Sequence, residues 1–321
     1  MDIRTFLSFE EIVAEPAYRS SNGVNEVTYE SLVGHYTFQD DVHCCYLNST
    51  GNLCNEAHKF GFVVRLKDQS LTIVGNSCAA TKFGADSSLR MDTARYNNEK
   101  RRRERLAELT EILESRDAYE RRLDACLNAI KDVKSNRDEF LSHFGNGTVS
   151  SLHDMARTGQ RRVVATAVSY RKHTYEDGYV EKERTTNSVT IGTLNGLNAI
   201  LESTYSLLVA EAKQIKQQLA EAEAITREAK QTTIDRVVTS VRRVSSLEAS
   251  VADLSADFAK LSNSDAGLFC YLVPDKSERI RAARYALLSR NQGASRDNAK
   301  SWLSQQDSVL ARSFGADKIE V

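Results

Sequence analysis

Apolar residues recur at intervals of three and four along two long stretches of the chain, a spacing typical of amphipathic helices. In residues 89–143 the apolar stripe runs to Leu113 and resumes, after a phase slip, at Tyr119. A second stripe fills residues 193–262. Such seams are expected of helices that pack in a coiled coil. The pattern therefore predicts two coiled-coil arms, 89–143 and 193–262.

The second arm has one weak point, near Thr232, where polar residues interrupt the stripe. Neither glycine nor proline lies there, and proline in a helix interior would cost about 3 kcal/mol. We therefore expect one continuous or kinked helix of about 100 Å, at ~1.5 Å per residue. The alternative is that the chain folds back near Thr232 and forms a three-helix bundle with the first arm.

Between the two arms, residues 161–191 alternate between apolar and polar side chains, which is the period of a β-strand. Asp177-Gly178 is a favoured two-residue turn for a β-hairpin. A turn at that position places Lys172 opposite Glu183, a favourable cross-strand ion pair. We expect an exposed two-stranded hairpin inserted between the helical arms.

The composition and the first residues of the sequence bear on the kind of partner and on the cellular compartment that we expect. Lysine and arginine total 43 and aspartate and glutamate total 44, so the net charge demands neither a nucleic-acid nor a membrane partner. The first residues lack the basic and apolar regions of a secretory leader, and no segment approaches the roughly 18 apolar residues of a membrane span. We expect a cytoplasmic protein, in which clustered cysteines hold metal more often than they form disulfides.

Four of the six cysteines lie between residues 43 and 78, around two strand-like runs. A hairpin with cysteines at its ends is typical of small zinc modules, which have too little apolar core to fold without the ion. A reduced cluster without metal is the other interpretation. The candidate ligands are Cys45, Cys54, His58 and Cys78, with Cys44 as an alternate for Cys45 and with His43 or His35 as further alternatives.

The run Val74-Gly75-Asn76-Ser77-Cys78 resembles the knuckle of zinc-ribbon-type modules in bacterial and phage proteins. The resemblance covers residues 44–80. It departs from that pattern at the first knuckle, which in those modules is usually Cys-x-x-Cys, because here a longer segment separates Cys45 from Cys54. The resemblance implies a structural zinc ion and a bacterial or phage source, and it implies no specific activity.

These patterns together predict a mainly α protein. Its fold would be a long antiparallel coiled coil or helical bundle with a small zinc-ribbon-like β head and an inserted β-hairpin. The expected parts are an N-terminal cap with the head, the first arm, a short helix with the hairpin, the second arm and a C-terminal helical segment. Their bounds are 1–88, 89–143, 144–192, 193–262 and 263–321.

Basic residues gather in three places: residues 100–105, the hairpin at 161–184 and a helix at 279–290. Such clusters can contact nucleic-acid phosphates. The competing interpretation is a solvated surface, since consecutive basic residues wrap around a helix and acidic neighbours can pair with them. The candidate nucleic-acid contacts are Lys100, Arg101, Arg102, Arg103, Arg105, Arg171, Lys172, Arg281 and Arg284.

The sequence contains no phosphate-binding loop, no dinucleotide-binding glycine pattern and no nucleophile motif. A catalytic zinc would need a His-Glu-x-x-His or His-x-Glu motif, and neither occurs. We therefore expect a non-enzymatic interaction or scaffold protein with a structural zinc ion. Its partner would be another protein, or a second copy bound through the coiled coil to form an oligomer. The alternative is a regulatory protein that binds nucleic acid through the three basic clusters.

Overall fold

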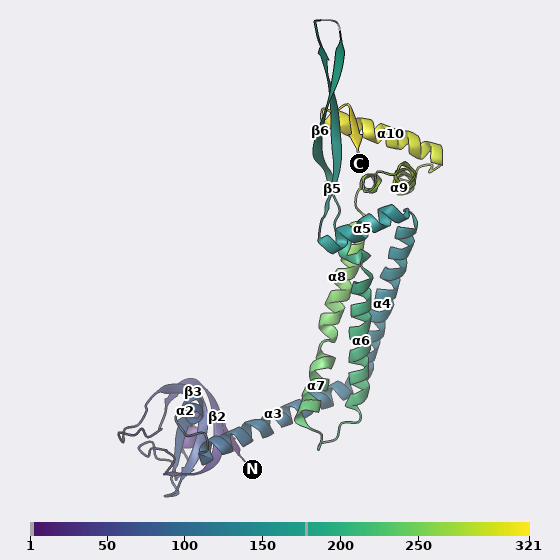
Figure 1. Ribbon diagram of the computed structural model, residues 1–321. Coiled ribbons are helices and arrows are strands. Elements are labelled where there is room, and N and C mark those ends of the chain that lie inside the picture. Colours follow the sequence, from purple (N-terminus) through teal and green to yellow (C-terminus); the bar gives the residue numbers. More distant parts are fainter. Residues whose placement is uncertain (1–2, 177–178) are drawn as a thin grey trace. The chain divides into compact units, whose positions relative to one another are not determined.

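The computed structural model describes residues 3–176 and 179–321, and the chain divides into two compact units, Met1–Glu108 and Leu109–Val321 (Figure 1). The described residues form ten α-helices and two β-sheets, of four and three strands. The expectation of a mainly α coiled coil with a small β head was therefore wrong, because both units mix helices with a sheet. None of the described helices combines the length and apolar character needed to cross a membrane.

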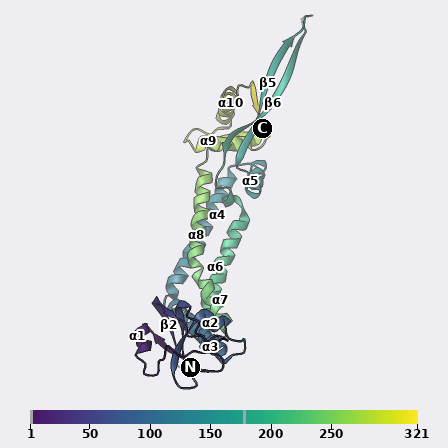
Figure 2. The same ribbon diagram turned by 90° about the vertical axis from the view of Figure 1, so that its left-hand side faces the viewer.

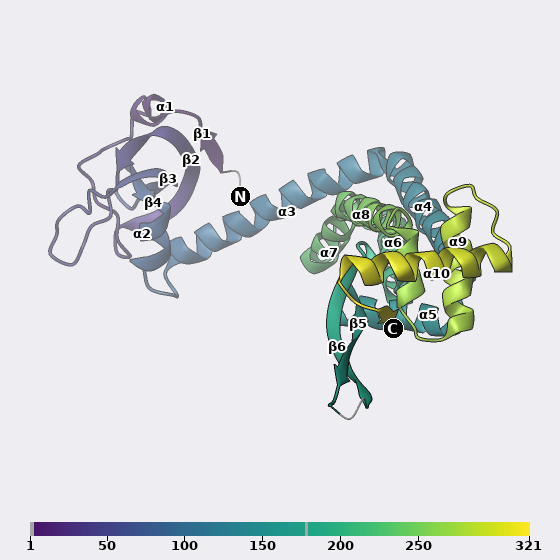
Figure 3. The same ribbon diagram turned by 90° about the horizontal axis from the view of Figure 1, so that it is seen from above.

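The first unit is built on a four-stranded sheet in the order β1-β2-β3-β4. Strand β1 pairs in parallel with β2, and the other two pairings are antiparallel. Figure 3 shows this curved sheet with the short helices α1 and α2 on opposite sides of it. The bounds are β1 Arg4–Phe6, α1 Phe9–Val13, β2 Tyr29–His43, β3 Ala57–Leu66, β4 Leu71–Gly75 and α2 Asn76–Thr81.

Apolar side chains cover both faces of this sheet and form two separate cores. Val64 and Cys44 belong to one core, whereas their neighbours Val63 and Cys45 belong to the other. The separation follows from the pleat of extended chain, which points successive side chains to opposite faces. Cys44 and Cys45 are therefore adjacent in sequence but lie in different cores.

Residues 89–143 form two helices where we expected one. Helix α3 (Ser88–Glu114) contains the boundary between the two units, and α4 (Arg116–Ser142) belongs to the second. The break lies at Ser115, inside the phase slip of the apolar stripe. A slip moves the apolar stripe around the helix, so one straight helix could not keep both halves of the stripe on the same partner.

Residues 193–262 do not form the continuous helix that we expected. They form a 3-10 turn η1 (Leu197–Ile200), then α6 (Glu202–Ala222), α7 (Gln231–Arg242) and α8 (Val244–Ser262). Helix α7 packs against α6, and α4, α6 and α8 lie side by side (Figure 2). The reversal at 223–230 fully buries four side chains of α7, Ile234, Val237, Val238 and Val241. Burying one such side chain stabilises the fold by about 1.5–3 kcal/mol. This burial favours the reversal although neither glycine nor proline lies at 223–230.

The second sheet has the order β6-β5-β7, where β7 is Lys318–Glu320, and is antiparallel throughout. The alternation at 161–191 correctly predicted the pairing of β5 (Arg162–Thr174) with β6 (Val180–Thr193). The predicted register was wrong by one residue, because Lys172 lies opposite Lys182 and Glu183 lies opposite Arg171. The predicted turn at Asp177-Gly178 lies outside the described residues.

A mixed group of short elements completes the second unit. They pack around the base of β5 and β6 and share one large apolar core. Beyond that base the outer parts of β5 and β6 project as a two-stranded ribbon (Figure 2). The bounds are α5 Asn146–Thr158, η2 Ala266–Tyr271, α9 Lys276–Leu288, α10 Arg296–Ser313 and β7 Lys318–Glu320.

The N-terminus of α5 is capped by a side chain from α9. The Glu278 carboxylate accepts hydrogen bonds from the backbone N–H groups of Gly147 (2.8 Å) and Thr148 (2.6 Å) and from the Thr148 hydroxyl (3.0 Å). Partial burial acts to raise the pKa of Glu278, but these donors outweigh it and hold the pKa below the usual range of a glutamate. A negative charge at this end also interacts favourably with the helix dipole.

We expect Glu278→Gln to destabilise the second unit by about 1–2 kcal/mol near neutral pH, because the amide keeps the shape of the cap and loses its charge. A carboxyl whose pKa is lowered by folding adds stability above its unfolded pKa and loses it as the pH falls. The difference from wild type should therefore shrink below about pH 4.3. Urea unfolding near neutral pH and below about pH 4.3 measures this difference in the free energy of unfolding. Glu139→Gln, at an exposed site on α4, is the control; equal losses in both variants would contradict the cap.

Candidate metal centre

Two short segments and one helix bring three cysteines together. Cys44 follows β2, and its backbone bonds the segment after Cys54: its N–H donates to the Glu56 carbonyl and its carbonyl accepts from Asn55, both at 3.0 Å. The Cys54 N–H donates to the Tyr46 carbonyl at 2.8 Å. Cys78 lies in α2, directly after β4. These backbone hydrogen bonds and the start of α2 place the three cysteines.

The three sulfur atoms have the spacing of a metal site. The Sγ atoms of Cys44, Cys54 and Cys78 all lie within 4.8 Å of one another. The Cys54 and Cys78 sulfurs are 3.8 Å apart. Two sulfurs bound to one tetrahedral zinc at ~2.3 Å would also be about 3.8 Å apart. Cys44 and Cys78 are buried and Cys54 is half-buried, so these three residues could hold a metal ion.

Backbone N–H groups point at two of these sulfurs, which favours the thiolate form that metals require. Burial raises the pKa of Cys44, and the N–H groups of Gly75 and Tyr46 oppose that effect. Partial burial also acts to raise the pKa of Cys54. There the Glu56 N–H, the Lys82 ammonium and the Cys78 thiol outweigh burial and lower the pKa.

Two charged side chains complete the cluster, and the sequence analysis missed both. The Glu56 carboxylate lies 3.7 Å from the Cys78 sulfur and 3.8 Å from the Cys54 sulfur. The Lys82 ammonium lies 3.3 Å from the Cys54 sulfur and 3.9 Å from the same carboxylate. A zinc ion with three thiolates and one carboxylate would carry a net charge of −2. Lys82 is placed to offset part of that charge.

Cys45 and His58, which were candidate ligands, do not belong to the group of ligand atoms within 4.8 Å of one another, although His58 lines the same pocket as Cys44 and Cys78. The Cys45 thiol contacts the Ser20 carbonyl at 3.5 Å, in the core on the other face of the sheet. Both ring nitrogens of His58 already have partners: Nε2 lies 2.6 Å from the Tyr36 hydroxyl and Nδ1 lies 3.1 Å from the Glu56 carbonyl. The structure thus groups Cys44, and not Cys45, with the other cysteines.

The alternative histidines also have other contacts. His35 Nδ1 lies 2.6 Å from the Tyr96 hydroxyl, and His43 Nδ1 lies 3.1 Å from the Asn55 carbonyl. A pocket of about 160 Å³ adjoins the cysteine cluster, and its lining includes Cys44, Cys78 and Glu56. A metal site needs an entry path of this kind.

The candidate nucleic-acid contacts fall into three groups. On α3, Lys100, Arg101 and Arg103 are exposed, whereas Arg102 and Arg105 are half-buried, and Arg105 pairs with Glu108 at 2.7 Å. On α9 the arginines bond to backbone: Arg281 donates to the Ser142 and His143 carbonyls, and Arg284 donates to the Ala294 carbonyl. Arg171 and Lys172 are exposed on the ribbon.

Comparison with known proteins adds no identification. No family model, no curated protein and no solved structure matches this chain.

Proposed function

We propose that the first unit is a zinc-binding module and that its ion is structural. The observation that carries the proposal is the cluster of three cysteine sulfurs within 4.8 Å. Sulfur ligands at this spacing favour zinc, which is bound by thiolates at ~2.3 Å in a tetrahedron. Each sulfur comes from a different segment, so one ion would tie together the end of β2, the loop after Leu53 and the helix α2.

Glu56 is the fourth ligand in this proposal. A carboxylate oxygen at ~2.0 Å from a tetrahedral zinc would lie about 3.5 Å from each sulfur. The Glu56 oxygen is already 3.7 Å from the Cys78 sulfur and 3.8 Å from the Cys54 sulfur, and it would move closer to Cys44 when the ion binds, since it lies outside the group of atoms within 4.8 Å that includes Cys44. With four protein ligands the ion has no open position for water, which is the arrangement of structural rather than catalytic zinc.

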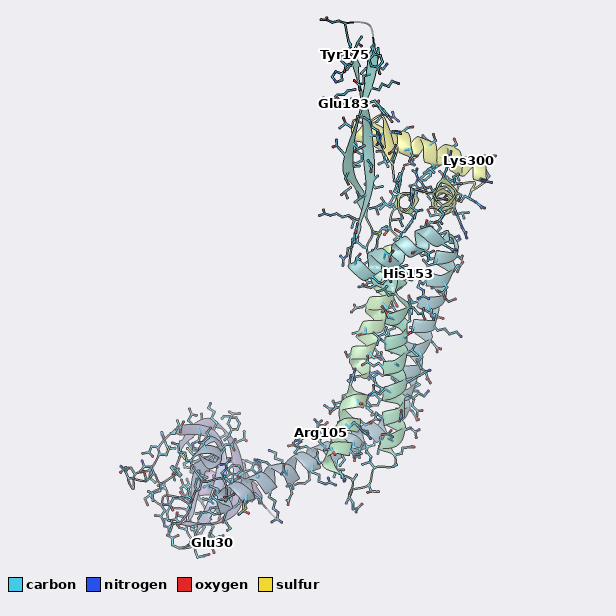
Figure 4. All side chains as sticks on the ribbon, viewed as in Figure 1. Glu30, Arg105, His153, Tyr175, Glu183 and Lys300 are labelled. Atoms are coloured by element: carbon cyan, nitrogen blue, oxygen red, sulfur yellow. The ribbon has the colours of Figure 1, made fainter. Side chains whose placement is uncertain are left out.

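The rest of the proposal is that the protein works by binding a partner rather than by catalysis. The ribbon of β5 and β6 exposes aromatic and apolar side chains at its outer end: Tyr175 is 51% exposed, Tyr179 63% and Val180 48%. Exposed apolar groups that cluster in this way often mark interaction sites. Figure 4 shows Tyr175 near the end of this ribbon and Glu183 further down it.

A cobalt titration of the zinc-free protein tests the metal site. We expect tetrahedral cobalt bands with thiolate charge transfer, and displacement of cobalt by zinc. Glu56→Ala should weaken binding by at least about 10-fold, and Glu56→Cys should add charge-transfer intensity through a fourth sulfur. His58→Gln is the matched control and should leave the affinity unchanged. If His58→Gln weakens binding more than Glu56→Ala does, the assignment of the fourth ligand is wrong; if wild type binds no cobalt or zinc, the module is not a metal site.

A further inference from the structure

The projecting ribbon separates its charges between its two faces. Paired residues of an antiparallel ladder share a face, and successive residues alternate. The register from Tyr170 to Thr174 runs without a shift against residues 180–184. One face therefore carries Tyr170, Lys172, Thr174, Val180, Lys182 and Arg184, and the other carries Arg171, His173, Glu181 and Glu183.

Both acidic residues among these paired positions lie on the second face, where they have partners. Glu183 lies opposite Arg171 and 3.4 Å from the His173 ring, and Glu181 accepts from the Tyr175 hydroxyl at 2.7 Å. In the sequence, acidic residues offset the positive charge of this segment. In three dimensions they lie away from the first face, which we call the basic face. Between residues 170–174 and 180–184 its charged residues are all cations, and Glu320 of β7, which pairs with Thr166, lies on the same face nearer the body of the unit.

Lys172 and Lys182 lie directly opposite one another on the basic face. Both are exposed, and neither forms an ion pair within the described residues. Like charges in directly opposed positions destabilise a strand pair. Arg184 already has one partner, because it forms an ion pair with Glu320 of β7 at 2.6 Å. The opposed lysines thus carry an unfavourable interaction that an anionic ligand would relieve.

Hydrogen-bond donors continue this face along β6. The next side chains on it, below Arg184, are Thr186, Ser188 and Thr190, and all three are exposed. Hydroxyl donors and cations in one row suit phosphate oxygens, which accept from both. Tyr170 adds an aromatic ring, 39% exposed, to the same face.

We propose that the basic face of the β5–β6 ribbon binds duplex DNA, with Lys172, Lys182 and Arg184 contacting phosphates. The major groove admits a two-stranded β-ribbon, and this ribbon projects from its unit in a way that would let it enter a groove. The proposal is independent of the zinc module, because the metal ligands and the ribbon belong to different units.

Fluorescence anisotropy with a labelled duplex DNA tests the proposal. About three phosphate contacts predict a slope near −2 to −3 for log Kobs against log salt concentration. The Lys172→Gln/Lys182→Gln double variant should bind at least about 10-fold more weakly at low salt and should flatten that slope by about 2. Arg171→Gln, on the opposite face, is the matched control and should keep both values.

Folding of the variants is checked by circular dichroism, and removing the opposed lysines should not lower the melting temperature. The proposal is overturned if wild type does not bind the duplex, if the double variant binds as wild type does, or if Arg171→Gln costs as much as the double variant. It is also overturned if the wild type binds polyglutamate or phosphatidylserine vesicles but no duplex, since the partner would then be an acidic protein or a membrane.

Discussion

Cys78→Ser is expected to abolish stoichiometric zinc binding and to unfold the first unit. The Cys78 side chain is 2% exposed, and its sulfur lies 3.8 Å from that of Cys54. A serine hydroxyl is a poor ligand at neutral pH, so the variant would lose one of three thiolates. Structural zinc contributes about 10–16 kcal/mol of apparent binding free energy in small modules, more than the stability of most domains. The measurement is metal content by mass spectrometry together with thermal unfolding.

Cys45→Ser is the matched control for this prediction. Cys45 is also buried, at 5% exposure, and a serine there can still donate to the Ser20 carbonyl. We expect this variant to retain its zinc and most of its stability. Loss of zinc from Cys45→Ser and not from Cys78→Ser would reverse the assignment of the ligands.

Phe269→Ala is expected to destabilise the second unit by about 3–5 kcal/mol, the usual cost of truncating a buried phenylalanine. Phe269 is fully buried in η2. The centroid of its ring lies 5.0 Å from that of Phe144, 5.6 Å from that of Phe140 and 6.1 Å from that of Tyr285. These rings come from α4, the segment after it and α9. The substitution therefore leaves a cavity where several elements meet.

Phe314→Ala provides the comparison for Phe269→Ala, because Phe314 is 40% exposed at the end of α10. Its loss should change the free energy of unfolding by less than about 1 kcal/mol. Denaturant unfolding of both variants measures the two costs. Similar costs for the two substitutions would mean that the aromatic cluster does not anchor the core of the second unit.

Local periodicity predicted helix at 89–143 and 193–262 and strands at 161–191, but it did not predict the breaks that divide both long helical stretches. The phase slip after Leu113 marked the site where α3 ends and α4 begins, although we expected one helix across it. Alternation at 161–191 predicted β5 and β6. These features depend on residues close in sequence, so one short window contains the information that determines them.

The features that the sequence analysis missed depend on contacts between distant residues. Strand β2 carries a polar stretch, Gln39-Asp40-Asp41, that obscures its alternation. The residues on either side of this stretch pair with β3, and residues 34–36 pair with β1, which supplies the missing constraint. The reversal at 223–230 has no local breaker, and tertiary burial of α7 determines it. The β7 strand has only three residues, which is too short for any periodic signal.

The candidate metal site also has one part that the local sequence predicts and another that depends on contacts between distant residues. Residue type and clustering pointed to Cys54 and Cys78, which the structure brings together. The choice between Cys44 and Cys45 depended on which face of the sheet each one enters, and the sequence left it open. His58 follows Cys54 at a favourable spacing, but the Tyr36 hydroxyl on the neighbouring strand lies against its ring. Glu56 was not predicted, because nitrogen and sulfur ligands were expected, although a carboxylate two residues after a ligand cysteine is a usable signal.

X-ray absorption at the zinc edge of the loaded protein tests the central claim most directly. We expect a four-coordinate site with three sulfurs at ~2.3 Å and one oxygen at ~2.0 Å. In Glu56→Cys the oxygen shell should be replaced by a fourth sulfur. A site with two or fewer sulfurs, or a zinc ion surrounded only by oxygen and nitrogen, would contradict the assignment of Cys44, Cys54 and Cys78 as ligands.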